Sequence, residues 1–263
     1  MKKALIICFL FFVLQQLFAT AALALSMALG GTTDMAAVQT SSQFAWIFGC
    51  SYLMLYPLMI FIVHFLMANS GRSGLSGQWE RPRPVAVVLS LAILLAIIIW
   101  LGNVLEYLSL PDLIEGQLGA MVKNPLCILI LSVLGPVTEE ICFRYGVMGS
   151  LLESARWRRW AIPVSALLFG VIHMNPPQII AAFVLGLFLG WLYLRTRSLW
   201  LPIICHVVNN TNSTVIALLF GVESSNADLF PTPWAMAVAT VVSIGLTLWL
   251  LGRLRRVLPV AGE

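Results

Sequence analysis

Charged side chains are scarce in this chain: only 10% of its 263 residues are Asp, Glu, Lys or Arg, whereas 60% are hydrophobic. A soluble globular domain carries about 25% charged residues. The scarcity excludes a soluble domain with one anchor and indicates an integral membrane protein embedded in the lipid bilayer. The net charge of +4 does not indicate a nucleic-acid partner, because the basic residues are spread over short connections rather than gathered in one patch.

The chain also lacks a Cys-x-x-Cys pair, a long linker, an internal repeat and a low-complexity tract. All five cysteines fall in apolar segments, and for at least four of them this is typical of small buried side chains. Because no linker divides the chain, we expect residues 1–263 to form a single integral membrane domain.

Long apolar segments are what the sequence has in abundance. A membrane-spanning helix needs about 20 such residues. The sequence therefore predicts an all-α polytopic membrane bundle of about eight transmembrane helices. The predicted segments are Ala4–Leu29, Phe44–Met67, Val85–Leu108, Pro125–Leu152, Ala161–His173, Pro177–Leu194, Leu199–Phe220 and Trp234–Leu251. The fifth segment is short, and its start could lie as early as Trp157.

The basic residues alternate between the connections of these segments. All of the 15 basic residues except Lys123 and Arg144 fall on one predicted side, together with both termini, and the opposite side holds most of the acidic loop residues. This positive-inside pattern predicts a plasma-membrane or inner-membrane protein with both termini cytoplasmic. The first segment is expected to be a retained helix rather than a cleaved signal, because it is long and carries Gln15 and Gln16 in its middle.

A few ionisable residues remain inside the predicted spans. Each costs about 2.5–3.5 kcal/mol at mid-helix on insertion scales for acidic or basic residues, so such groups usually face the bundle interior and mark a functional site. They are His64, Glu139, Glu140, Arg144, His173 and His206. His64 has no polar neighbours in its segment, so we interpret it as an interfacial or core histidine.

Helix geometry separates the two adjacent glutamates. Glu140 and Arg144 are four residues apart with the acid first, so they share a face and can form an ion pair. Glu139 points about 100° away, because a helix has 3.6 residues per turn, and it is available for another partner. A purely structural cluster of all three charges is the alternative interpretation. It suits Glu140 and Arg144 better than it suits Glu139.

Polar groups of two further segments fall at a similar depth. At about 1.5 Å per residue, Glu139, His173 and Asn210 lie roughly 16–20 Å from the cytoplasmic ends of their segments, and His206 lies roughly 10 Å in. His206 and Asn210 are four residues apart and share a face. His173 precedes Met174-Asn175-Pro176-Pro177, which must break a helix, and broken backbone at membrane depth lines a cavity or is buried in protein. A site buried at mid-membrane depth is therefore expected.

These residues form a recognisable series. Glu139-Glu140-x-x-x-Arg144, Phe169-x-x-x-His173 and His206-x-x-x-Asn210 resemble, in order, the three motifs of the CPBP family of CAAX-type prenyl endopeptidases and bacteriocin-processing or immunity (Abi) proteins. The resemblance covers residues 125–220, the expected catalytic core, and implies an intramembrane endopeptidase. It implies that Glu139 activates water, that Glu140 and Arg144 support its helix, and that His173, His206 and Asn210 complete the site.

The resemblance implies a substrate that is a membrane-associated or lipidated protein or peptide. Buried Glu139 suits the base that activates water and the acid for the leaving amine, and Asn210 suits an amide donor to the oxyanion. No cofactor is favoured. Zinc is the alternative, with His173 and His206 as candidate ligands. Two other functions stay open: an ion- or proton-coupled transporter, for which no inverted repeat is visible, and a non-catalytic immunity protein.

Overall fold

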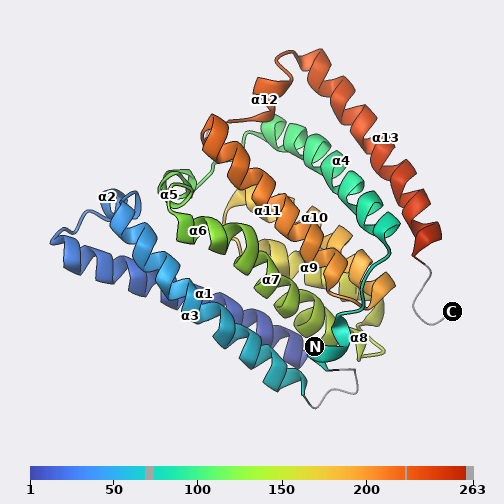
Figure 1. The fold of residues 1–263 in the computed structure, drawn as a ribbon, viewed down its shortest axis with the longest axis horizontal. Helices are drawn as coiled ribbons and strands as arrows, with labels where there is room; N and C mark the ends of the chain where they lie inside the picture. The colour runs from blue at the N-terminus through green and yellow to red at the C-terminus, as the bar shows by residue number, and fades with distance from the viewer. Residues whose placement is uncertain (69–73, 223, 259–263) are drawn as a thin grey trace. The chain divides into compact units, whose positions relative to one another are not determined.

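The computed structural model describes residues 1–68, 74–222 and 224–258. Arg72 and Glu223, two charged residues of the predicted connections, lie outside the described residues. Within the described ranges the chain forms helices joined by turns, with no strand, so the all-α prediction is confirmed (Figure 1).

In the part of the chain that the structure describes, seven helical segments are long and apolar enough to cross a membrane. Four of them begin at a proline, which fits the first helical position because its missing N–H would have no partner there. The seven are α1 (Lys2–Gly30), α3 (Ser42–Met67), α4 (Pro84–Leu108), the segment Pro125–Leu152, α10 (Pro176–Thr196), α11 (Trp200–Phe220) and α13 (Pro233–Val257).

The predicted fifth span differs from the structure. It is the helix α9 (Ala161–Val171) of 11 residues, which ends before His173, and at about 1.5 Å per residue it is too short to cross a bilayer core of about 30 Å. A short 3₁₀ helix, Arg158–Trp160, precedes it. His173 therefore lies in the turn between α9 and α10, because the Asn-Pro-Pro sequence begins the next helix instead of extending α9.

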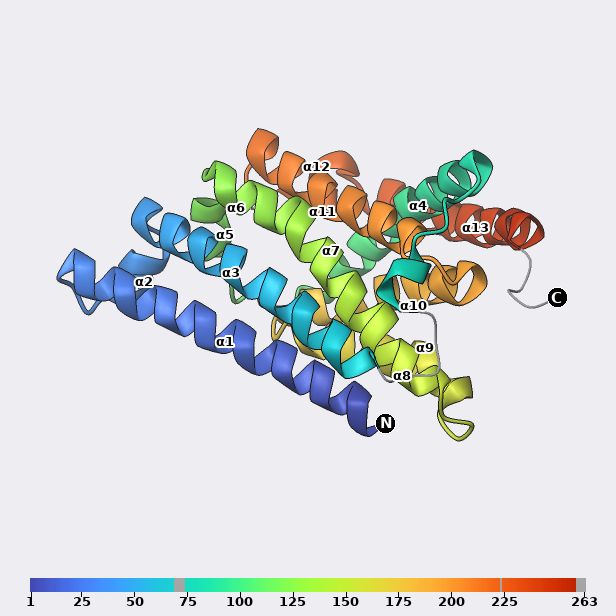
Figure 2. The same cartoon turned by 60° about the horizontal axis from the view of Figure 1, so that its bottom comes forward.

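The segment Pro125–Leu152 is one continuous helix (Figure 2). Narrow α-helical turns alternate with wider π-helical turns, in which the backbone bond spans five residues. The order is α6 (Pro125–Leu129), π-helical η2 (Ile130–Leu134), α7 (Gly135–Glu140), π-helical η3 (Ile141–Met148) and α8 (Gly149–Leu152). The sequence predicted the length of this helix but not its wide turns.

Short helices occupy the connections between the long ones. They contain fewer than eight residues each, and polar caps start two of them, since the Asp34 and Ser225 side chains accept from backbone N–H groups. They are α2 (Met35–Gln39), the 3₁₀ helix Leu75–Gln78, α5 (Glu115–Met121) and α12 (Asn226–Leu229).

The chain divides into two compact units. Unit 1 comprises Met1–Leu75, Ile114–Ala161 and Asn210–Glu223, and unit 2 comprises Ser76–Leu113, Ile162–Asn209 and Ser224–Glu263. The predicted core at residues 125–220 contributes to both units. That residues 1–263 form a single domain stays a prediction.

In unit 1, α1 and α3 pack against each other and against η3. The Phe11 and Phe143 rings meet edge to face at 5.6 Å. Gly146 permits the close approach, because a Cβ there would lie 3.1 Å from both Ile7 and Val63 side-chain atoms. As a result, the side chains of η3 are fully or almost fully buried.

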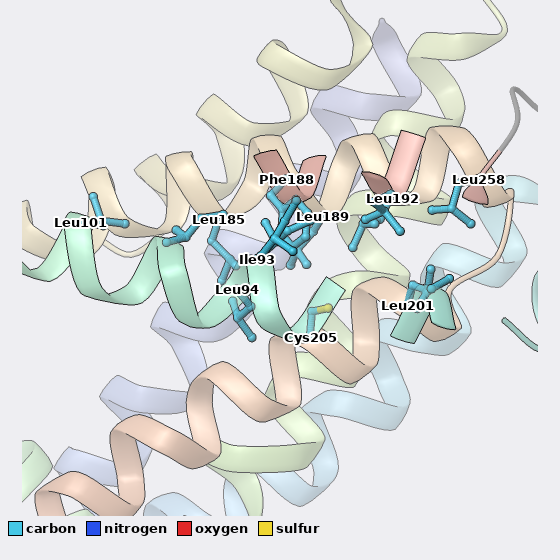
Figure 3. Close-up of a cluster of buried hydrophobic side chains, with 14 residues drawn as sticks. Ile93, Leu94, Leu101, Leu185, Phe188, Leu189, Leu192, Leu201, Cys205 and Leu258 are labelled. Carbon is cyan, nitrogen blue, oxygen red and sulfur yellow. The ribbon is translucent and has the colours of Figure 1, made fainter. Parts of the chain in front are cut away.

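In unit 2, an apolar cluster joins α4, α10, α11 and α13 (Figure 3). Ile93 and Leu94 of α4 are fully buried in it, and Leu189 of α10 and Cys205 of α11 are buried beside them. All five cysteines are free, and every one except Cys50 is buried, as expected for at least four of them.

Candidate active site

A buried ion pair organises the middle of the helix Pro125–Leu152. Arg144 Nε donates to Glu140 Oε2 at 2.8 Å and Arg144 Nη2 donates to Glu140 Oε1 at 3.3 Å. Both side chains have no exposed surface. The predicted pair is therefore present, in the two-pronged geometry that makes an arginine–carboxylate contact strong.

Glu139 has different surroundings from its neighbour. It is only partly buried, and it is the penultimate residue of α7, just before the wide turns of η3 begin. Its carboxylate lies within electrostatic range of the Tyr52 and Tyr56 hydroxyls of α3. Neither tyrosine could be predicted from the sequence, because neither lies in a motif and only the packing of α3 brings them to this helix.

Asn210, at the midpoint of α11, bonds to the first wide turn of the same helix. Its Nδ2 donates to the backbone carbonyl of Leu131 at 3.0 Å. One turn further along α11, the Thr214 hydroxyl accepts from the Ser132 hydroxyl at 3.0 Å. These bonds hold the second half of α11, from Asn210 onward, against η2 in unit 1.

In unit 2, the His173 ring is oriented by Phe169, four residues earlier. His173 Nδ1 lies 2.8 Å from the Phe169 carbonyl oxygen, and the two rings meet edge to face at 5.1 Å. A carbonyl oxygen can only accept, so Nδ1 carries the hydrogen. In the neutral imidazole this leaves Nε2 with a lone pair for water, substrate or a metal.

Phe169 also contacts the second motif histidine. The His206 ring meets it edge to face at 5.5 Å, and His206 is 3% exposed. The fully packed Phe169 ring therefore has a histidine on two of its sides, which explains the place of a phenylalanine in the second motif.

Close helix packing fixes the position of Phe169. A Cβ on Gly186 of α10 would lie 3.1 Å from Ala166 and 3.3 Å from the Phe169 ring, and a Cβ on Gly170 would lie 2.7 Å from the Ile179 carbonyl. These contacts make α9 and α10 an antiparallel pair with almost no space between their backbones.

The turn after His173 is anchored from elsewhere in unit 2. Met174 has a φ of 52°, a left-handed conformation that is uncommon for a non-glycine residue. The fully buried Asn175 accepts from the Leu113 N–H at 3.0 Å and donates to Asp112 at 3.2 Å. Asn175 was missed as a supporting residue, although an asparagine before Pro-Pro is a signal for a fixed turn.

The predicted site residues fall into two groups. Unit 1 contains Glu139, Glu140, Arg144 and Asn210, and unit 2 contains His173 and His206. His64 is exposed on α3, so it is not a core histidine.

The donor set fits a zinc ion in part. Among the described residues, no three His, Cys, Asp or Glu side chains form a metal-binding group. The Nδ1-to-carbonyl bond of His173 is nevertheless the arrangement that orients a zinc-bound imidazole. His173 and His206 could supply two of the three protein ligands that a catalytic zinc uses.

Comparison with known proteins confirms the resemblance seen in the motifs. Residues 121–212 match the family described as type II CAAX prenyl endopeptidase Rce1-like. YdiL of Bacillus subtilis (strain 168), which is provisionally named a membrane peptidase, is 33% identical over 94 residues. The membrane-embedded CAAX protease MroQ of Staphylococcus aureus (strain USA300) is 31% identical over 102 residues.

These matches are partial. They cover 36% and 37% of this chain, and 38% and 41% of the lengths of the two relatives. No solved structure matches the chain. The family match at residues 121–212 contains all three motifs and excludes α1, α3, α4 and α13.

Proposed function

We propose, from the Rce1-like segment at residues 121–212, that this integral membrane protein is an endopeptidase. Its substrate would be a membrane-associated or lipidated protein or peptide. The observation that carries the proposal is the contrast between two adjacent glutamates. Glu140 is fully buried and paired with Arg144, whereas Glu139 is partly exposed and lies within electrostatic range of the Tyr52 and Tyr56 hydroxyls.

Glu139 is the proposed base. It takes a proton from water, whose oxygen attacks the carbonyl carbon of the scissile peptide bond. The carbonyl oxygen becomes an oxyanion, and the C–N bond then breaks as Glu139 returns the proton to the leaving amine. Such a proton transfer contributes about 10²–10⁴-fold in rate.

His173, His206 and Asn210 complete the proposed site. His173 has its Nε2 available to hold the attacking water, because Nδ1 is bonded to a carbonyl. The side-chain amide of Asn210 suits an oxyanion donor, and removing one such donor typically costs about 10²–10³ in rate. Glu140 and Arg144 would act as supports of the Glu139 helix.

Replacing Glu139 by Gln tests the proposed base. We expect a loss of about 10²–10⁴-fold in cleavage, with the amount of folded protein unchanged, because an amide cannot accept the proton. The measurement uses liposome-reconstituted protein and a quenched peptide with an S-farnesyl cysteine four residues from its C-terminus, beside the same peptide with free cysteine. Glu106→Gln, near the end of α4 and outside the motifs, is the matched control. Cleavage by Glu139→Gln at the control rate contradicts the proposal.

A metal-independent mechanism is the form that we favour, and elemental analysis separates it from a zinc mechanism. Active protein should contain no stoichiometric zinc, and chelators should inhibit no more than in detergent controls. If the histidines bind zinc, His173→Ala and His206→Ala should each lose one zinc per chain together with activity. Metal affinity should then also fall at low pH as the imidazoles are protonated. That result would contradict the metal-independent mechanism but leave the proposed peptidase activity standing.

The proposed location is a plasma or inner membrane, with both termini cytoplasmic. The antiparallel packing of α9 and α10 supports this, because it brings the chain back to the side from which it left. The chain enters this pair just after Arg158 and Arg159 and leaves it at Arg195 and Arg197. The start of α9 and the end of α10 are therefore both basic, as expected on the cytoplasmic side.

A further inference from the structure

Tyr56 of α3 is placed against a gap in the surface of the helix Pro125–Leu152. The gap is at Gly135: a Cβ there would lie 3.0 Å from the Tyr56 hydroxyl oxygen and 3.7 Å from its Cζ. The Tyr56 side chain is 6% exposed and is fixed on the other side by the Tyr52 ring, which meets it edge to face at 5.5 Å. The glycine therefore admits the hydroxyl group to the backbone surface of the helix.

Glu139 is one turn after Gly135, on the same face of the helix. Side chains on a helix lean toward its N-terminus, so each covers the turn that precedes its own Cα. The Glu139 side chain thus extends over the turn that begins at Gly135, where the Tyr56 hydroxyl lies. The electrostatic interaction between Tyr56 and Glu139 agrees with this placement.

We propose that the Tyr56 hydroxyl donates a hydrogen bond to the Glu139 carboxylate and fixes its orientation for water activation. A phenol can donate one hydrogen, and an ionised carboxylate accepts at either oxygen. With one oxygen engaged by Tyr56, the other is directed toward water. Tyr56 is a positioning residue here, and its role rests on the proposed function of Glu139 as the base.

Three other groups near Glu139 in unit 1 fit this role less well. Tyr52 also interacts with Glu139, but its hydroxyl is placed to donate to the Gln15 carbonyl, at 3.5 Å. Cys142 lies on the following turn of the same helix and also interacts with Glu139, although a thiol is only a weak donor. Arg144 is engaged with Glu140. The phenol of Tyr56 is the strong donor directed at the Gly135 turn.

The test compares Tyr56→Phe with Tyr52→Phe, in the reconstituted full chain and with the two peptides described above. Loss of the donor favours the protonated carboxyl, and only the ionised carboxylate can act as a base. For Tyr56→Phe we expect kcat to fall about tenfold with KM unchanged, and the acidic limb of the pH–rate profile to move up by about one pH unit. Tyr52→Phe should leave that limb in place.

A purely structural role would lower activity equally at every pH. An unmoved limb in Tyr56→Phe, with Glu139→Gln inactive, overturns the positioning role and leaves the peptidase standing. If Glu139→Gln is active, Glu139 is not the base, and the proposed function of that residue is wrong. If Tyr56→Phe does not fold, 3-fluorotyrosine at position 56 supplies a stronger donor, and the limb should move to lower pH. No movement there also overturns the proposal.

Discussion

Two membrane-spanning helices of similar length, Pro125–Leu152 and α4, are built in opposite ways. α4 is a regular α-helix whose contact face in unit 2 is apolar along most of its length. The helix Pro125–Leu152 in unit 1 contains two stretches of π-helix and a fully buried ion pair. In an apolar stretch of 18 residues, 56% of the residues of Pro125–Leu152 are buried, against 39% of those of α4, so Pro125–Leu152 is the more enclosed of the two.

The difference shows that a membrane helix with buried polar side chains needs a more specific structure than an apolar one. Apolar packing is non-directional, so α4 needs only side chains of suitable shape. Hydrogen bonds and ion pairs are directional, and each must be completed because no water is available in the bilayer core. Wide turns occur frequently at functional sites, and here one follows Glu140 directly while the other provides the carbonyl that Asn210 binds.

The largest effect on stability is expected from breaking the ion pair. Glu140→Gln or Arg144→Met should each cost about 3–5 kcal/mol, because either change leaves an uncompensated buried charge. The free energy of unfolding of purified protein, measured by titration with a denaturing detergent, checks this.

The double variant Glu140→Gln/Arg144→Met sharpens the same comparison. It removes both charges, so it should recover much of the lost stability. A double variant as unstable as the sum of the two single variants would show that the residues act independently.

A smaller effect is expected in the apolar cluster of α4. Leu94→Ala should cost about 2 kcal/mol, mainly through the cavity it creates, since the unfolded reference in lipid retains an apolar environment. The same detergent titration measures it. A cost above that of Arg144→Met would contradict the ranking of the two helices.

The smallest effect is expected at the polar end of α4. Asn103 donates to Thr240 at 2.9 Å and to the Met236 carbonyl at 3.2 Å, and it accepts from Asn226 at 2.7 Å. Asn103→Ala should nevertheless cost only about 0.6–1.7 kcal/mol, the range for interhelical hydrogen bonds in membranes.

The partners of Asn103 retain other bonds, which keeps this cost low. Thr240 also donates to the Met236 carbonyl, and Asn226 also donates to the Ile99 carbonyl. If the cost of Asn103→Ala instead matched that of Arg144→Met, losing a polar contact would destabilise both units equally, which would contradict the comparison.

Local features of the structure could be predicted from the sequence. The long helices follow from the length of apolar runs, and the Glu140–Arg144 pair follows from a four-residue spacing. The position of His173 was predicted only in part, because the sequence indicated the break after it but placed His173 on the preceding helix.

Features that depend on tertiary packing could not be predicted. A wide turn inserts one residue into a helix without changing its composition, so η2 and η3 leave no pattern in the sequence. Tyr56 lies far from Glu139 along the chain, and the Leu131 carbonyl that binds Asn210 is a backbone group present at every residue. The edge-on contact of both histidines with Phe169 likewise requires α9 and α11 to be in place.

The location of the ion pair within one helix has a consequence for biogenesis. Because Glu140 and Arg144 are four residues apart, they can pair as soon as their own turn forms, before any neighbouring helix has been synthesised or inserted. The insertion machinery then receives a segment whose charges at these two positions already cancel. A pair shared between two helices would instead leave each helix to enter the membrane with its charge exposed, at about 2.5–3.5 kcal/mol apiece.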